Sequence, residues 1–294
     1  MTAKLKPWLL AARPKTLPAA AAPVLIGTAM AWRDGGGHWP SAILAALCAL
    51  LLQVAANYAN DYFDYVKGTD TAERLGPTRA TAAGWVTPAA MRRAFIIALA
   101  LAGVMGAYLL VRGGLPAIII GLLCVAAAIL YTGGPFPLGY HGLGDLFVFI
   151  FFGLVGVGGT YYVQTLDINA AVLWAGVAPG LLSVAILTVN NLRDIDGDRS
   201  SGKRTLPARL GAAFGRAEYL LCLLIACIGI PLWLTVKYDA PMTIMLAAAA
   251  LAAAGAPLRI LLREAPSARY NLALAQTGRL LLVYGILFSI GLWL

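Results

Sequence analysis

The chain alternates between long apolar runs and short polar connections along almost its whole length. A helix that crosses the hydrocarbon layer of a membrane needs about 20 mainly apolar residues. Nine runs approach or exceed this length, and we expect a transmembrane helix in each. Their approximate bounds are 16–32, 41–65, 90–111, 115–131, 145–165, 170–192, 214–236, 241–262 and 271–294. The pattern predicts an all-α integral membrane protein with nine transmembrane helices, folded as a single domain over 1–294.

The composition supports a lipid environment. Hydrophobic residues make up 61% of the 294 residues and charged residues only 12%, against about 25% charged residues in an average soluble domain. A soluble fold of this length could not cover so much apolar surface with polar side chains. The net charge of +9 does not indicate nucleic-acid binding, because the basic residues are spread over short connections rather than gathered on one face.

The basic residues also predict the orientation in the membrane. Of the 22 lysines and arginines, 18 lie in the N-terminal segment and in the connections after the second, sixth and eighth expected helices. Nine spans place these four regions on one side. The other side receives only Arg33, Arg112 and Lys237. Cytoplasmic loops are enriched in lysine and arginine, so we expect a cytoplasmic N-terminus.

Two long polar loops on the expected cytoplasmic side, about 66–89 and 193–213, follow the second and sixth helices. The helix end before each loop carries the same pattern, Asn-x-x-x-Asp, which occurs at Asn57 and Asp61 and again at Asn190 and Asp194. A second aspartate and a lysine follow each copy: Asp64 and Lys67, then Asp198 and Lys203. The recurrence predicts two four-helix pseudo-repeats, about 16–131 and 145–262, which make the copies face each other, with a last helix at 271–294.

Helical spacing makes each copy a stripe of acids. At about 100° per residue, Asn57, Asp61 and Asp64 share one helix face, as do Asn190, Asp194 and Asp198. Asp196 falls on the far side, and we expect it to be a solvated charge.

Carboxylates near a membrane are costly and repel one another, so a cation is expected between the stripes. Oxygen ligands without His or Cys favour a hard ion, and Mg²⁺ shares its coordination between carboxylates, water and phosphate. The alternative is an ordinary acid-rich helix end at a wet interface, which two copies in register disfavour. Two stripes flanked by basic residues therefore predict a diphosphate held by two Mg²⁺ ions.

These motifs resemble the UbiA superfamily of intramembrane prenyltransferases, and within it the MenA type of menaquinone synthesis. The resemblance covers nearly the whole chain. It rests on the stretches 13–18, 60–70, 131–139, 144–153, 190–194 and 202–206. It implies transfer of a polyprenyl group from a prenyl diphosphate to 1,4-dihydroxy-2-naphthoate, with loss of CO₂ and diphosphate. It also implies a bacterial cytoplasmic membrane, with the active site facing the cytoplasm.

The resemblance further implies a role for each site residue. The metal ligands would be Asp61, Asp64, Asp194 and Asp198, with Asn57 and Asn190 contributing oxygens or hydrogen bonds. The substrate-binding residues would be Arg13, Asn57, Lys67, Arg79, Asn190, Arg193 and Lys203. Of the aromatic residues that could line the path of an allylic cation, which include Tyr161 and Tyr162, we select Tyr131 because a Gly-Gly-Pro break follows it. Many relatives carry a third acid soon after Asp64, whereas here the next acid is Asp70, beyond a glycine turn, and its role stays open.

Alternatives remain at this stage. Another aromatic acceptor, such as 4-hydroxybenzoate or homogentisate, fits the same chemistry. A secondary transporter would also use paired repeats with an ion site, although its acids should lie near the middle of the bilayer. A CDP-alcohol phosphotransferase ranks third, because its compact acidic run is missing from the sequence. The length of the prenyl tail, the lateral opening and the oligomeric state are not predicted.

Overall fold

A computed structural model describes residues 5–69 and 75–294. Within these residues every regular element is helical and no strand occurs. The structure therefore confirms the expectation of an all-α protein. Asp70 lies outside the described residues.

The helical elements follow the apolar runs of the sequence. They are α1 (Lys6–Ala11), η1 (Pro14–Thr16), α2 (Pro18–Arg33), α3 (Trp39–Val66), α4 (Pro88–Leu130), η2 (Leu138–Tyr140), α5 (Gly144–Phe149), η3 (Ile150–Val155), α6 (Gly156–Thr165), α7 (Ala170–Arg193), α8 (Ile195–Ser200), α9 (Leu206–Leu210), α10 (Ala212–Leu224), η4 (Ile225–Gly229), α11 (Ile230–Tyr238), η5 (Met242–Ala254), α12 (Gly255–Arg263) and α13 (Tyr270–Gly291).

Seven helices in the described part of the chain are long and apolar enough to cross a membrane. The difference from nine has two causes. The first expected run forms α2, which has only 16 residues. The third and fourth runs both lie in α4, whose 43 residues contain a non-helical Gly114 with φ 60° and ψ −150°.

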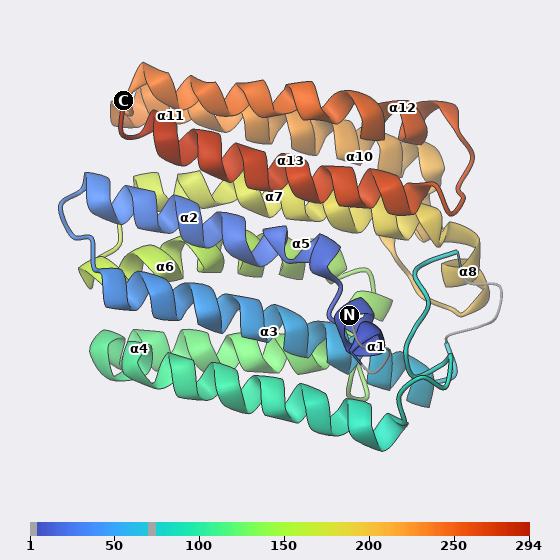
Figure 1. Cartoon of the computed structure of the whole chain (residues 1–294). Coiled ribbons are helices and arrows are strands. Elements are labelled where there is room, and N and C mark those ends of the chain that lie inside the picture. The colour runs from blue at the N-terminus through green and yellow to red at the C-terminus, as the bar shows by residue number, and fades with distance from the viewer. Residues whose placement is uncertain (1–4, 70–74) are drawn as a thin grey trace.

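Helix α4 is too long to be one straight span. At 1.5 Å per residue, 43 residues would extend about 65 Å, roughly twice the thickness of a bilayer core. The chain instead folds back at Gly114, since a β-carbon added at Gly121 would lie 3.2 Å from a methyl group of Leu110. Figure 1 shows the two parts of α4 running back along each other.

The long helices run in nearly parallel directions and form one bundle (Figure 1). The N-terminus, α1 and α8 lie at one end of this bundle, and α11 and the C-terminus lie at the other. We call the end that carries α1 and α8 the site end. Helix α3 reaches this end at its C-terminus, where the Tyr58 hydroxyl donates a hydrogen bond to the carbonyl of Trp8 beside α1 (3.2 Å).

The interior of the bundle is built around α7, which is the most buried of the seven candidate spans. Small residues let neighbouring helices approach it closely. A β-carbon on Gly153 would lie 2.6 Å from the carbonyl oxygen of Gly176, and one on Gly156 would lie 2.7 Å from Pro23. The first contact packs η3 against α7, which carries the second aspartate motif, and the second packs α6 against α2.

Candidate active site

The first aspartate motif occupies the last turns of α3, and its three polar residues point inward. Asn57, Asp61 and Asp64 are 3%, 2% and 2% exposed. The two oxygens of Asp61 accept hydrogen bonds from the backbone N–H groups of Ala80 (3.0 Å) and Thr81 (2.9 Å). A carboxylate has about four acceptor positions, so Asp61 keeps lone pairs for another partner.

Asp64 is held by two side chains. The guanidinium of Arg79 donates a hydrogen bond to Oδ2 at 2.5 Å, and the hydroxyl of Tyr140 donates one to Oδ1 at 2.7 Å. Arg79 immediately precedes Ala80 and Thr81. The loop after α3 therefore folds back over its own helix and binds both aspartates of the motif.

The second motif straddles the junction of α7 and α8. Helix α7 ends at Arg193, and Asp194 lies at the junction. The backbone N–H of Asp198 donates to the carbonyl of Asp194 at 2.7 Å, so the four-residue helical spacing continues across it. Thr205 donates a hydrogen bond to Asp198 Oδ2 at 3.1 Å.

Arg193 organises this second motif from a buried position, with 2% of its surface exposed. It donates to both oxygens of Asp194, from Nε at 2.9 Å and from Nη2 at 2.6 Å. It also donates to Oδ1 of Asn190 (2.8 Å) and to Oδ1 of Asn271 on α13 (2.7 Å). Such a planar fork fixes a carboxylate in both position and orientation. In this structure the Arg193 guanidinium is therefore bound to protein side chains, and it positions Asp194.

The structure brings the two motifs together at Tyr140. Lys203, from the second motif, lies 4.0 Å from Oδ1 of Asp64, from the first. The ammonium groups of Lys203 and Lys67 lie 4.4 Å and 5.0 Å from the centre of the Tyr140 ring. Lys67 also donates a hydrogen bond to the carbonyl of Thr132 at 2.6 Å. Two aspartate motifs and two cations thus share one site.

Burial and neighbouring charges change the ionisation of two groups here. Burial lowers the pKa of Lys67; the charge of Asp64 raises it in part, and the charge of Lys203 lowers it further. Burial raises the pKa of the Tyr131 hydroxyl well above its ordinary value, and the carboxylates of Asp145, Asp198 and Asp64 raise it further, whereas Arg13 lowers it. Tyr131 therefore stays protonated, with carboxylates from both motifs near its hydroxyl.

Arg13 belongs to a tightly fixed N-terminal segment. It adopts a left-handed conformation with φ 50°, between α1 and η1. Asn57 holds this segment, because its Nδ2 donates to the carbonyl of Ala12 (2.9 Å) and to the hydroxyl of Thr16 (3.2 Å). The amide group of Asn57 therefore links the first motif to Arg13. The expected contribution of the Asn57 oxygen to a metal site stays a prediction.

The donor set fits Mg²⁺, although no preformed cage surrounds a single ion. Within 5–69 and 75–294, no three His, Cys, Asp or Glu side chains lie close enough together to hold one metal. Mg²⁺ is commonly bound through one or two carboxylates and completed by water and substrate phosphate. Oxygen-only ligands on two motifs, with the Lys203 ammonium 4.0 Å from Asp64, suit an ion that binds together with a phosphate group.

Sequence reasoning missed three polar residues of the site. Tyr140 directly follows the Gly-Pro-rich stretch 131–139, Thr205 lies in the stretch 202–206, and Asn271 is an amide at the start of the last apolar run. Tyr140 and Thr205 lie beside or within stretches that carry the family resemblance, and the only signal for Asn271 was a polar residue that opens an apolar run.

Other expectations about side chains can be compared directly with the structure. The side chain of Asp196 is 89% exposed, as expected for a solvated charge. Tyr161 and Tyr162, considered as walls for a cation, instead donate hydrogen bonds to Asp34 (2.8 Å) and to the carbonyl of Gly113 (2.9 Å). These partners follow α2 and end the first part of α4, away from the site end, so neither tyrosine hydroxyl is directed at the aspartates.

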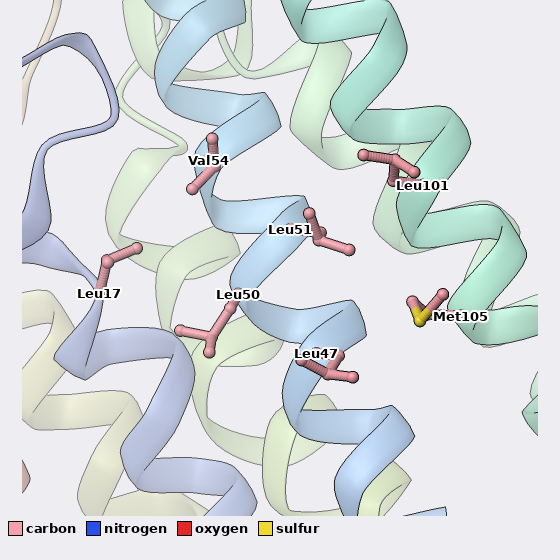
Figure 2. A pocket seen from close by; sticks show the side chains of 7 residues that line it. All are labelled: Leu17, Leu47, Leu50, Leu51, Val54, Leu101 and Met105. Atoms are coloured by element: carbon pink, nitrogen blue, oxygen red, sulfur yellow. The ribbon is translucent and has the colours of Figure 1, made fainter. Parts of the chain in front are cut away.

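An apolar groove continues the face of α3 that carries the aspartates. It has a volume of about 290 Å³ and is lined by Leu17, Leu47, Leu50, Leu51, Val54, Leu101 and Met105. Figure 2 shows the side chains from α3 and α4 that border it. Val54 lies two turns before Asp61 on the same helix face. The groove therefore leads away from the acidic site and presents only hydrocarbon.

Comparison with known proteins agrees with this arrangement. Residues 20–290 match the UbiA prenyltransferase family. The 1,4-dihydroxy-2-naphthoate octaprenyltransferase of Haemophilus influenzae is 40% identical over 244 residues, which cover 76% of each chain. The enzyme of that name from Escherichia coli is 44% identical over 223 residues, covering 74% of this chain and 72% of its own.

Solved structures share the fold at low sequence identity. The apo structure of a UbiA homologue from Aeropyrum pernix K1 aligns with a TM-score of 0.68 at 20% identity, covering 94% of this chain and 96% of its own. A UbiA homologue from Archaeoglobus fulgidus bound to GPP and Mg²⁺ aligns with a TM-score of 0.67 at 14% identity, covering 98% and 100%. The chain belongs to the UbiA prenyltransferase family and is an integral membrane protein.

Proposed function

We propose that the protein transfers a polyprenyl group from a prenyl diphosphate to 1,4-dihydroxy-2-naphthoate, with loss of CO₂ and diphosphate, to give demethylmenaquinol. The observation that carries the chemistry is the approach of Lys203 to Asp64 at 4.0 Å, which joins the two aspartate motifs in one site. The acceptor follows from the names of relatives that are 40% and 44% identical. The transporter and phosphotransferase alternatives find no support in the site.

The aspartates are proposed to hold two Mg²⁺ ions that the substrate diphosphate bridges. Asp61, Asp64, Asp194 and Asp198 would provide carboxylate ligands, and Asn57 and Asn190 would contribute hydrogen bonds or amide oxygens. When bound, Mg²⁺ supplies Lewis-acid stabilisation of the negative charge on the leaving diphosphate. The name of the Archaeoglobus fulgidus structure, which contains GPP and Mg²⁺, supports this assignment.

The basic residues would bind the phosphate oxygens. Lys67 and Lys203 reach the site from the two loops, and Arg13 is held at its edge by the segment that Asn57 fixes. Arg79 and Arg193 would combine phosphate binding with another role, because each already orients one aspartate. Cations placed before the reaction stabilise the developing charge without further rearrangement.

The prenyl cation forms when the bond from its first carbon to the diphosphate oxygen breaks. The protonated Tyr131 would present a π face without supplying a nucleophilic phenolate. The electron-rich ring of the acceptor then forms the new carbon–carbon bond, and release of its carboxylate as CO₂ restores aromaticity. This sequence needs no separate protein base.

The membrane arrangement is part of the proposal. The break at Gly114 divides α4 into two spans, and α2 with the preceding η1 provides another, which gives nine in all. We place the N-terminus and the site end in the cytoplasm of a bacterial cell, and we assign α2 to α4 and α5 to α12 to the two pseudo-repeats. The excess of lysine and arginine at that end supports this orientation.

The proposal is tested in purified membranes with labelled prenyl diphosphate, Mg²⁺ and a panel of acceptors. We expect prenylation and CO₂ release with 1,4-dihydroxy-2-naphthoate, loss of at least 100-fold in Asp64→Ala and Asp194→Ala, and normal rates in the exposed control Asp196→Ala. Normal turnover in the first two variants would overturn the metal assignment. If a product formed with 4-hydroxybenzoate alone, the assigned acceptor would be wrong, and the assignment of prenyl transfer would still hold.

A further inference from the structure

The proposed reaction gives no role to the half-buried carboxylate of Asp145. Asp145 lies in the first turn of α5, outside both aspartate motifs. Its Oδ1 is buried and has no hydrogen-bond partner within the described chain. A buried acceptor without a partner loses the hydrogen bonds that water would give it. Such a group is stabilised by a ligand that brings a donor.

The residue before Asp145 lies against Tyr131, beside the proposed active site. A β-carbon added at Gly144 would lie 3.1 Å from the hydroxyl oxygen of Tyr131 and 3.3 Å from a methyl group of Leu187 on α7. The residue before Asp145 therefore packs against Tyr131. The charges of Asp145, Asp64 and Asp198 all act on that hydroxyl. Tyr131 thus connects Asp145 to both motifs.

A neighbouring acid differs from Asp145 in its contacts. Glu218 on α10 interacts electrostatically with Asp145, and its Oε2 accepts a hydrogen bond from Thr188 at 3.1 Å. Thr188 thus supplies Glu218 with a donor from the protein. Asp145 Oδ1 has no such donor among the described residues and is therefore available to a donor on a ligand.

The chemistry of the substrates selects which of them can do so. Diphosphate is an anion and offers acceptors, so a carboxylate repels it. The proposed Mg²⁺ ligands are the two Asn-x-x-x-Asp motifs, and Asp145 lies outside both. The aromatic acceptor carries phenolic O–H groups, which donate to carboxylates in short, strong hydrogen bonds.

We propose that Asp145 binds the aromatic acceptor, with its Oδ1 accepting a hydrogen bond from a phenolic hydroxyl beside Tyr131. This inference rests on the proposed prenyl transfer to a phenolic ring. The hydrogen bond orients the ring toward the cation site and increases electron density on the ring while the hydroxyl keeps its proton. Asp145 thereby becomes a specificity residue for hydroxylated acceptors.

The test separates the binding of the two substrates. In Asp145→Ala we expect the KM for the acceptor to rise about 10- to 100-fold, as for loss of a hydrogen bond to a charged group, with the KM for prenyl diphosphate within twofold of the original. Asp145→Asn, which keeps the size and a carbonyl acceptor, should lose less. Asp196→Asn makes the same substitution at an exposed aspartate and should change neither constant.

A hydroxyl-deletion series supplies a second readout. Equilibrium binding of 1,4-dihydroxy-2-naphthoate and of its two monohydroxy analogues is measured without prenyl diphosphate. Deleting the hydroxyl that Asp145 binds should weaken binding to the original protein about 10-fold or more and leave binding to Asp145→Ala nearly unchanged. If thermal unfolding shows that Asp145→Ala does not fold, the same binding series is measured with Asp145→Asn.

Two results would overturn the proposal. In the first, deletion of either hydroxyl weakens acceptor binding equally in the original protein and in Asp145→Ala. In the second, Asp145→Ala raises only the KM for prenyl diphosphate. If the original protein prenylates 4-hydroxybenzoate instead, the proposed acceptor is wrong. The role of Asp145 is then tested with 4-hydroxybenzoate and benzoate in the same binding experiment.

Discussion

Each aspartate motif contains one carboxylate paired with a buried arginine. Asp64 pairs with Arg79 at 2.5 Å, and Asp194 pairs with Arg193 at 2.6 Å. Buried pairs contribute little net stability, but removal of one partner leaves a costly uncompensated charge. These arginines therefore fix the directions of the aspartates before any substrate arrives.

Arg193→Lys tests this positioning role. The lysine keeps the charge but cannot reach Asp194, Asn190 and Asn271 together. We expect a loss of about 2 kcal/mol in unfolding free energy, in line with lost hydrogen bonds to charged groups, and at least a 10-fold higher Mg²⁺ concentration for half-maximal turnover. Thermal unfolding in detergent and a Mg²⁺ titration of the rate measure the two effects.

Arg199→Lys is the matched control, because the exposed Arg199 forms an ion pair with Asp196 at 3.6 Å and one exposed hydrogen bond to the carbonyl of Ala208 at 3.0 Å. Such pairs contribute about 0–1 kcal/mol, so neither quantity should change measurably. If Arg193→Lys required no more Mg²⁺ than this control, the assignment of Arg193 as a positioning residue would be wrong.

Lys67 gives the site a pH dependence. Its pKa is lowered mainly by burial, so the ammonium loses its proton at a lower pH than an ordinary lysine. The charged form binds phosphate. We therefore expect kcat/KM for prenyl diphosphate to be highest below this lowered pKa and to fall as the pH rises through it.

The matching variant is Lys67→Arg, whose guanidinium stays charged throughout the accessible range. A pH profile of kcat/KM should extend to higher pH in this variant, while Lys237→Arg, an exposed position at the other end of the bundle, should keep the original profile. If kcat/KM fell at the same alkaline pH in all three proteins, a group other than Lys67 would control the loss of activity.

Sequence spacing predicted the aspartate faces well and their partners poorly. Asn57, Asp61 and Asp64 share a buried face because helix geometry is local. The donors to Asp61 come from the backbone N–H groups of Ala80 and Thr81, which any residue type except proline could supply. Tyr140 approaches through a loop far from Asp64 in sequence. Spacing within a helix carries no information about such contacts.

At the scale of elements, α3 joins two kinds of surface on one face. Its C-terminal turns carry the aspartates, and the preceding turns line the apolar groove through Leu47, Leu50 and Val54. A hydrocarbon tail attached to a diphosphate at Asp61 could extend past Asn57 and then along this apolar stripe. The groove is therefore our candidate for the position of the tail.

Leu50→Trp fills the groove and tests this placement. We expect the KM for long polyprenyl diphosphates to rise several-fold, while dimethylallyl diphosphate, which is too short to reach Leu50, is used as before. Leu122→Trp makes the same change at an exposed position of α4 outside the groove. Equal use of short and long donors by Leu50→Trp would place the tail elsewhere.

Gly114 illustrates where helix prediction from apolar runs succeeds. Two runs separated at this glycine are expected from the sequence, and the structure breaks α4 there with φ 60° and ψ −150°. Only glycine adopts this conformation without strain. The packing angle between the two parts depends on contacts such as Gly121 with Leu110, which the run lengths do not specify.

Gly114→Ala should therefore destabilise the protein by about 1–3 kcal/mol, although a β-carbon there would meet no atom within 4 Å. The control is Gly103→Ala, also in α4 and also without a close neighbour, but without a positive φ. Replacing a helical glycine by alanine is expected to be neutral or stabilising by up to about 1 kcal/mol. Thermal unfolding measures both, and equal shifts would exclude backbone strain as the cause.

At the scale of the whole molecule, charge and chemistry lie at the same end. Both aspartate motifs and the basic loops that follow them gather at the site end, whereas Arg33, Arg112 and Lys237 occupy the ends of helices on the opposite side. The sequence predicted this asymmetry because the positive-inside rule depends only on residue counts in loops. It could not predict which loops touch, since that depends on packing of the helices.

The orientation in the membrane follows from this asymmetry and can be measured with single cysteines. Ser201→Cys, just after α8, and Asp167→Cys, just after α6, introduce thiols at exposed positions on opposite sides of the bundle. The unaltered chain is the control, because its Cys48 and Cys124 are half-buried and Cys222 and Cys227 are buried, all within apolar helices.

A membrane-impermeant maleimide should label Asp167→Cys in intact spheroplasts and Ser201→Cys only in inverted vesicles, while the unaltered chain stays unlabelled in both. The physical reason is that moving the basic loops at the site end across a membrane is opposed by their charge, whereas the opposite loops carry few lysines or arginines. The reverse labelling would put the active site outside the cell. Between Asp167 and Ser201 the structure has one long helix, α7, which puts the two positions on opposite sides of the membrane. Labelling of both positions from the same side would contradict this arrangement.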